Sequence, residues 1–411
     1  MQHQDRPHYK HYIGITSQIG FCQVPLRLDA FNQCSFSCSY CFAKARGGYR
    51  GDRTIQIARA QNLEERFRRI QGGLISSAVD EFLSRRIPIQ FGGMTDPFSS
   101  FEQKTGATRN LLEILTARKY PTLISTKSAT LADPGYSRLL AAGNYLVRFS
   151  ISVVREAERI NIEKGTPSPT ELFHTIRMLS DRGIKCAVRF QPIIPGHEQC
   201  AFDLIRKANH AGAKHITLEY LKLPTDDLKS PICMLESSNG ERLIDHYRRC
   251  GATQQGRELV LPRESRIGFL SEASKLARKQ GLSVGFGDNE FLPYSDGQSC
   301  CSGADLYLTD INLFESNPAS LIRRKKKHEL IGFGEFSDRW IPSSNINTYL
   351  NSHVRPLSKA GEASWISYLR EHWRVGAIYA PDFFHGVEFA GSEDDTGMPN
   401  FVKNPSRFLA L

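Results

Sequence analysis

The sequence predicts an α/β protein whose first half forms a partial (β/α)6 barrel and whose second half forms a C-terminal appendage. Short runs rich in β-branched and aromatic residues alternate with longer stretches of helical periodicity. Several helical stretches end at glycine, as at Gly183 and Gly212. Strands that alternate with helices in this way form parallel sheets. Six such repeats in this half of the chain favour an open barrel.

The predicted strands and helices follow one another between residues 26 and 221. The strands are expected at Leu26–Phe31, Pro88–Phe91, Pro121–Thr126, Tyr145–Ser152, Ile184–Ile194 and His215–Leu221. The helices are expected near Asn62–Arg85, Lys104–Arg118, Asp133–Ala142, Thr170–Arg182 and Phe202–Ala211. Because ligands bind at the carboxyl ends of the strands in such folds, we expect functional residues there.

The alternation weakens after Leu223, which sets the expected domain boundaries. These are an N-terminal segment over 1–23, the barrel core over 24–223, an insertion with a terminal helix and strand over 224–290, and the appendage over 291–411. The helix is predicted at Glu264–Gln280, and the strand at Leu282–Gly287 can join the barrel. The appendage holds all three tryptophans, and we expect it to fold because its aromatic residues need burial.

The composition of the chain limits the kinds of protein that it can be. The chain has 411 residues, of which 40% are hydrophobic, and it contains no apolar run long enough to span a membrane. Its amino terminus lacks the apolar core of a secretory signal, so a cytoplasmic location is expected. The formal charge of +10 favours polyanionic partners such as DNA or RNA.

Three cysteines, Cys34, Cys38 and Cys41, directly follow the first predicted strand. A loop of this length can aim three thiolates at one point. Three thiolates satisfy three irons of a [4Fe–4S] cluster and leave the fourth iron open to another ligand. A zinc site, with Cys22 or His11 as the fourth ligand, is the alternative. A disulfide framework is disfavoured because ten cysteines in 411 residues are sparse.

Polar and glycine residues follow the next three strands. Gly92 and Gly93 allow close backbone approach to a ligand, although a plain turn between strand and helix is the alternative. The third strand leads into Ser125 and Lys127, and a lysine ammonium can pair with a carboxylate. The fourth carries Ser150, whose hydroxyl can meet a ribose.

Together these motifs resemble one branch of a known superfamily. The series is Cys34-x₃-Cys38-x₂-Cys41, Gly93-Met-Thr-Asp-Pro97, Ser125-Thr-Lys127, Phe149-Ser150, Glu163-Lys-Gly-Thr-Pro-Ser168 and Pro192-Ile-Ile-Pro195. It resembles the spore photoproduct lyase-like branch of the radical S-adenosylmethionine (SAM) superfamily, over roughly residues 24–223. The resemblance implies a partial barrel of the radical SAM type with a [4Fe–4S] cluster on the three cysteines. It also implies reductive cleavage of SAM to a 5′-deoxyadenosyl radical, and an electron donor such as flavodoxin or ferredoxin.

The same resemblance implies the residues that bind the cofactor. It assigns Thr95 and Lys127 to the SAM carboxylate, Ser150 to the ribose and Tyr40 to the adenine. Gly92 and Gly93 stand where such enzymes bind the amino group. The remaining cofactor-binding candidates are Asp96, Ser125, Glu163 and Arg189.

One departure from the branch concerns its hydrogen-donating cysteine. Spore photoproduct lyases carry that cysteine immediately before the Thr/Ser-Asp turn, where this chain has Met94. We therefore expect shared radical generation but a different substrate. Cys300 and Cys301 are catalytic candidates as hydrogen donors to a product radical, or alternatively ligands of a second cluster. An inert buried pair is the other interpretation.

The expected substrate is a nucleic acid or nucleotide that is repaired or modified, with DNA repair by a lyase as one form. Basic residues after the cysteine loop can contact phosphates and an aromatic one can stack a base, although a solvated loop is an equal alternative. These residues are Lys44, Arg46, Tyr49, Arg50 and Arg53. The first rival is a radical SAM enzyme acting on a peptide, protein or small metabolite. The second is a non-enzymatic, zinc-stabilised nucleic-acid-binding protein.

Overall fold

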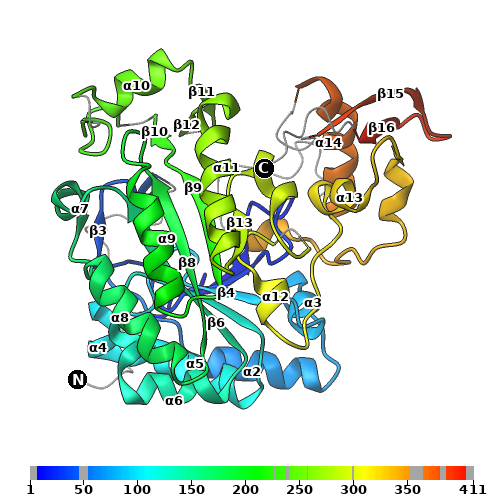
Figure 1. Ribbon diagram of the computed structural model, residues 1–411. Helices are drawn as coiled ribbons and strands as arrows, with labels where there is room; N and C mark the ends of the chain where they lie inside the picture. The colour runs from blue at the N-terminus through cyan, green and yellow to red at the C-terminus, as the bar shows by residue number, and fades with distance from the viewer. Residues whose placement is uncertain are drawn as a thin grey trace.

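A largely parallel sheet dominates the computed structural model, which describes residues 7–45, 54–225, 227–236, 240–256, 258–298, 300–350, 364–379 and 386–403. In these residues the sheet has eight strands in the order β1-β2-β4-β5-β6-β8-β9-β13 (Figure 1). All neighbouring pairs are parallel except β1 with β2. The strands are β1 (Ile13–Ile15), β2 (Leu26–Leu28), β4 (Ile89–Phe91), β5 (Thr122–Thr126), β6 (Tyr145–Val153), β8 (Lys185–Ile193), β9 (His215–Tyr220) and β13 (Ser283–Phe286).

The sheet confirms the predicted α/β class and partial barrel. Within the described ranges its two edge strands, β1 and β13, do not pair with each other, so the barrel stays open. The strand expected at Leu282–Gly287 does join it, as β13 beside β9. Strand β1 lies in the N-terminal segment, where the sequence showed too little periodicity to predict an element. Its three residues are fixed by pairing with β2 rather than by a pattern of their own.

Helices fill the connections between the parallel strands. Those of the barrel are α2 (Ala60–Gln71), α3 (Ala78–Ser84), α4 (Ser100–Thr105), α5 (Ala107–Ala117), α6 (Pro134–Ala142), α7 (Glu156–Ile162), α8 (Pro169–Ser180), α9 (Cys200–His210) and α11 (Arg263–Lys279). The single helical stretch predicted at Asn62–Arg85 is two helices. The chain turns between them at Gly73, whose φ of +80° is a conformation that glycine adopts readily.

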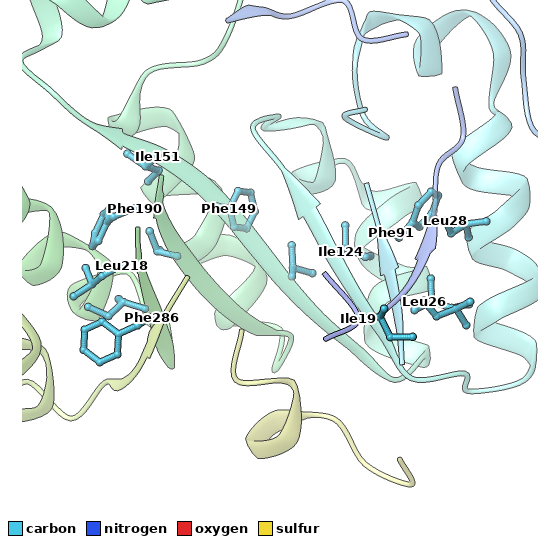
Figure 2. Close-up of a cluster of buried hydrophobic side chains, with 14 of the residues drawn as sticks. Ile19, Leu26, Leu28, Phe91, Ile124, Phe149, Ile151, Phe190, Leu218 and Phe286 are labelled. Carbon is cyan, nitrogen blue, oxygen red and sulfur yellow. The ribbon is translucent and has the colours of Figure 1, made fainter. Parts of the chain in front are cut away.

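Side chains of the strands alternate between two unlike faces of the sheet. On β6, Val147, Phe149 and Ile151 point toward the helices and are buried, and Figure 2 shows the last two with the apolar side chains of neighbouring strands. Arg148 and Ser150 occupy the intervening positions and point to the inner face. Because strand side chains alternate with a period of two, one strand serves both an apolar core and a polar interior.

The amino end of this inner face is closed by a small apolar cluster. Leu123, Leu146 and Ala187 from the sheet pack there with Cys300 and Ala304 from the segment after β13. That segment includes a 3₁₀ helix (Asn289–Tyr294) and α12 (Ala304–Tyr307). The polar part of the inner face therefore faces the carboxyl ends of the strands.

The last part of the described chain packs around tryptophans. It comprises α13 (Pro318–Arg324), α14 (Trp365–Tyr379) and a sheet of β14 (Leu330–Ile331), β16 (Pro399–Lys403) and β15 (Val387–Glu393). Trp365 and Trp373 are buried. Their indole N–H groups donate to the carbonyls of Ser316 at 2.7 Å and Pro399 at 2.8 Å. Burial of these aromatic residues agrees with the expectation that the appendage folds.

Further small elements complete the fold. They are β3 (Ser37–Cys38), α1 (Phe42–Ala45), β7 (Glu163–Lys164), β10 (Leu223–Pro224), α10 (Leu243–Arg249), β11 (Thr253–Gln255), β12 (Glu258–Val260) and 3₁₀ turns at Thr130–Ala132, Phe333–Phe336 and Asn347–Tyr349. None of the helices in the described residues is long and apolar enough to cross a membrane.

Candidate functional site

The cysteine loop is anchored beside the carboxyl ends of the strands. Cys38 lies in β3, which pairs antiparallel with β7 so that Cys38 stands opposite Glu163. The Ser39 amide donates to the Ile162 carbonyl at 2.8 Å, and the Cys41 amide reaches the Cys38 carbonyl at 3.4 Å. Two segments far apart in the sequence are thereby joined at the site.

The thiols of this loop are partly shielded from solvent. Burial, reinforced by the nearby Asp96 carboxylate, raises the pKa of Cys34 to about 12. Burial raises the pKa of Cys38 to about 11, although the Lys127 ammonium opposes it. These thiols therefore need a cationic ligand to ionise, and a coordinated metal deprotonates a cysteine.

The spacing of the possible ligands bears differently on a single metal ion and on a cluster. Within the residues that the structure describes, no three His, Cys, Asp or Glu side chains converge closely enough to hold one ion. A zinc ion needs four ligands within about 2.0–2.3 Å of one point. A [4Fe–4S] cluster instead takes one cysteine per iron, which spreads the sulfurs farther apart. Cys22, the candidate fourth zinc ligand, packs against the apolar cluster that contains Cys300.

A buried ion pair lies directly beneath the loop. The Lys127 ammonium is 2.7 Å from the Glu163 carboxylate, and it donates to the Ser150 carbonyl at 3.2 Å. The Tyr40 hydroxyl donates to the same carboxylate, and Lys127 lies 5.6 Å from the centre of the Tyr40 ring. Burial disfavours both charges, but mutual attraction outweighs it: the pKa of Lys127 is raised and that of Glu163 is lowered. Lys127 thus pairs with a carboxylate of the chain itself, and its contact with the SAM carboxylate stays a prediction.

The turn after β4 is fixed by its own polar side chains. Gly92 has φ of +89°, and a Cβ there would lie 2.8 Å from Pro97. The Thr95 hydroxyl donates to the Phe31 carbonyl at 3.0 Å. The Asp96 carboxylate accepts from the Lys127 amide at 2.6 Å and from the Thr126 hydroxyl at 2.9 Å. Thr95 and Asp96, predicted as cofactor contacts, therefore connect the strand ends to one another.

Below these groups, the inner face carries charges that the sequence analysis only partly found. Arg189, a predicted cofactor residue, is next to Ser150 in register and forms an ion pair with Glu219. Lys222 approaches the same carboxylate at 3.3 Å. Burial opposes ionisation, yet these cations lower the pKa of Glu219 to about 2.

Arg148 and Glu219 were missed by the sequence analysis. The available indication was polar side chains at every second position of otherwise apolar strands, as in Leu146-Val-Arg-Phe-Ser150. Ser125, also a predicted site residue, accepts from Arg148 at 2.9 Å. The structure therefore gathers Ser125, Arg148, Ser150, Arg189 and Glu219 on one face.

Cys300 and Cys301 approach the inner face from its amino end, away from the cysteine loop. Cys300 is 5% exposed within the apolar cluster, and burial raises its pKa to about 12. The Cys301 carbonyl accepts from the Thr217 hydroxyl at 2.6 Å. A Cβ on Gly285 would lie 2.7 Å from the carbonyl carbon of Cys301, so this crossing requires glycine. Their catalytic role stays a prediction.

The basic residues expected to contact a nucleic acid are outside the part of the chain that the structure describes. These are Arg46, Tyr49, Arg50 and Arg53, together with the side chain of Lys44.

Comparison with known proteins gives distant similarity. No protein-family model matches the chain. It is 24% identical over 239 residues to uncharacterized proteins of Mycobacterium tuberculosis and Mycobacterium bovis, covering 55% of this chain and 67% of each relative. One similar solved structure is spore photoproduct lyase complexed with dinucleoside spore photoproduct, with a TM-score of 0.46 and 17% identity over 65% of this chain and 77% of that chain. Another is Streptococcus suis SuiB bound to S-adenosylmethionine, with a TM-score of 0.35 and 15% identity over 49% of this chain and 41% of that chain.

Proposed function

We propose that this protein is a radical SAM enzyme that abstracts a hydrogen atom from a nucleic acid or nucleotide. Cys34, Cys38 and Cys41 would hold a [4Fe–4S] cluster. The observation that carries the proposal is the connection of the cysteine loop to the barrel: β3 pairs with β7, and Glu163 of β7 pairs with Lys127 at the end of β5. This connection supports a cluster site beside the carboxyl ends of the strands, where ligands bind in parallel α/β sheets.

When bound, the cluster would supply the one-electron chemistry that cleaves SAM, as the resemblance implies. The residues of the chain would bind and orient. Lys127 stays charged at neutral pH because Glu163 compensates its burial, so it can hold a ligand carboxylate at the strand ends. Asp96 fixes the Lys127 amide, and Ser150 lies one strand farther along. Cys38 is buried and Cys34 is partly buried, which shields these two candidate ligands from water.

Net charge supports the proposed substrate, because a formal charge of +10 favours phosphate-bearing partners. A gel shift with DNA or RNA should weaken as salt rises, because phosphate contacts release counterions. Absence of binding at low salt would argue instead for a peptide, protein or small metabolite as the substrate.

An electron donor such as flavodoxin or ferredoxin is the proposed partner. In the described residues none of the ten cysteines forms a disulfide, and a reducing, cytoplasmic location is the proposed one.

Anaerobic reconstitution tests the proposal. The parent chain should bind about four irons with matching sulfide and cleave SAM under reducing conditions. Cys38→Ala should lose both properties. Cys250→Ala, a half-buried cysteine at the end of α10, should keep them. SAM cleavage by Cys38→Ala at the parental rate would overturn the assignment. Binding of about one zinc without sulfide would instead establish the zinc-stabilised alternative.

A further inference from the structure

One buried guanidinium on the inner face forms no ion pair in the described residues. Arg148 is 3% exposed, and its Nη2 donates to the Ser125 hydroxyl at 2.9 Å. Its Nε has no hydrogen-bond partner. In the described residues, no carboxylate lies within salt-bridge distance of Arg148. Buried arginines are nearly always paired, because an isolated buried charge is expensive.

The neighbouring charges do not neutralise Arg148. A balanced series of ion pairs runs along the next strands: Arg189 with Glu219, Glu219 with Lys222, Lys222 with Asp288, Asp288 with Arg266, and Arg266 with Glu290. It contains three cations and three carboxylates. Glu219 is near enough to favour the charged form of Arg148, but its ion-pair contacts are to Arg189 and Lys222, so Arg148 is one cation more than this series contains. Burial and the repulsion of Arg189 lower the pKa of Arg148 to about 10, so it remains charged at neutral pH.

The thiols near Arg148 do not supply the missing negative charge. Cys22 and Cys301 are close enough to Arg148 to interact with it electrostatically. Burial is the largest influence on both and raises both pKa values. Both are therefore protonated at neutral pH, and neither forms an ion pair with Arg148.

The position of Arg148 relates it to the proposed cofactor site. Ser150 follows two residues later on the same face of β6, which is about 7 Å along a strand. On the other side, Leu146 belongs to the apolar cluster that closes the amino end. Arg148 thus stands on the inner floor of the barrel, below the strand ends that would hold SAM.

We propose that Arg148, with the Ser125 hydroxyl beside it, binds an oxyanion of the substrate, a carboxylate or a phosphate, inside the barrel. That the bound anion belongs to the substrate rests on the proposed function, which this inference deepens. The anion site itself rests on the guanidinium that forms no ion pair. A guanidinium presents a planar fork that matches both oxyanions. Because the site lies on the inner floor, it suits the charged end of a small molecule or nucleotide.

Anion binding by the full chain, prepared without iron or SAM, tests the site. Thermal unfolding is followed in sodium phosphate, sodium acetate and sodium chloride at equal ionic strength, and the apparent dissociation constants are measured by calorimetry. Phosphate or acetate should raise the unfolding midpoint in a saturable manner that chloride does not reproduce. The oxyanion that binds more tightly identifies phosphate or carboxylate as the preferred group.

Variants separate the site from general charge effects. Arg148→Gln should weaken binding of the preferred anion at least about tenfold, because a charge-assisted hydrogen bond is lost. In chloride the same variant should unfold at or above the parental temperature. Arg148→Lys should give an intermediate affinity. Arg138→Gln, which removes an exposed arginine of α6, should bind like the parent. Equal stabilisation of the parent by all three salts, or parental affinity in Arg148→Gln, would overturn the proposal. Failure to assemble a cluster would overturn the proposed function and leave these binding results unaffected.

Discussion

The buried ion pair of Lys127 and Glu163 should have a far larger coupling energy than an exposed ion pair with the same nitrogen–oxygen distance. Its nitrogen–oxygen distance is 2.7 Å, and the side chains are 14% and 4% exposed. Lys207 and Asp203 on α9 are also 2.7 Å apart, but their side chains are 55% and 63% exposed. Both pairs join a lysine to a carboxylate at the same nitrogen–oxygen distance, but one pair is buried and the other is exposed.

The expected magnitudes follow from that difference. Removing one partner of a buried pair leaves a desolvated charge and destabilises a fold by about 3–5 kcal/mol. Because the Lys127 side chain keeps 14% exposure, Glu163→Gln should lie at the lower end, about 3 kcal/mol. Adding Lys127→Met removes the stranded charge, so the double variant should recover part of the loss, with a coupling energy of about 1–3 kcal/mol. The exposed pair should show about 0.5 kcal/mol or less.

The assay is a pair of double-mutant cycles measured by urea unfolding near neutral pH. Since the pKa of Glu163 is lowered, its contribution is present above its unfolded pKa and is lost as the pH falls through the folded value. Since the pKa of Lys127 is raised, its contribution is lost as the pH rises through that value. Neutral pH lies between the two windows.

Glu163→Gln should also lower iron retention after reconstitution, because Glu163 stands opposite Cys38 in the β3–β7 pairing. Coupling energies for the two pairs that agree within about 0.5 kcal/mol would refute the reasoning about burial.

Three further predictions concern the turn, the floor of the barrel and its thiols. Gly92→Ala should destabilise the fold by at least about 2 kcal/mol in urea unfolding, because the φ of +89° and the approach of Pro97 both exclude a Cβ; a neutral effect would contradict this. Burial lowers the pKa of His215 from 6.5 to about 4, so the unfolded chain binds more protons in that range. Stability should fall by about 2 kcal/mol from pH 7 to pH 5 through this group, and His215→Gln should reduce the slope; an unchanged slope would argue against it. Cys300 should react with iodoacetamide at least about tenfold more slowly than in the urea-unfolded chain, because it is buried and protonated; equal rates by mass spectrometry would place it at the surface.

The amino-acid sequence by itself determined the α/β class, the parallel order of the barrel strands and the three-cysteine loop. These features are local. A strand can be predicted from its residue composition and a helix from its hydrophobic periodicity, and Cys34, Cys38 and Cys41 are close together along the chain. Even Glu163 and Lys127 were candidates, because each lies in a short motif.

Only the tertiary structure decided how these groups are partnered. Glu163 and Lys127 are 36 residues apart, and nothing local shows that one neutralises the other. The same holds for Arg148: its sequence neighbours are ordinary strand residues, and only the packing of adjacent strands shows a buried charge without a partner. Partnering across a sheet depends on register and on which face each residue occupies, which a linear pattern does not contain.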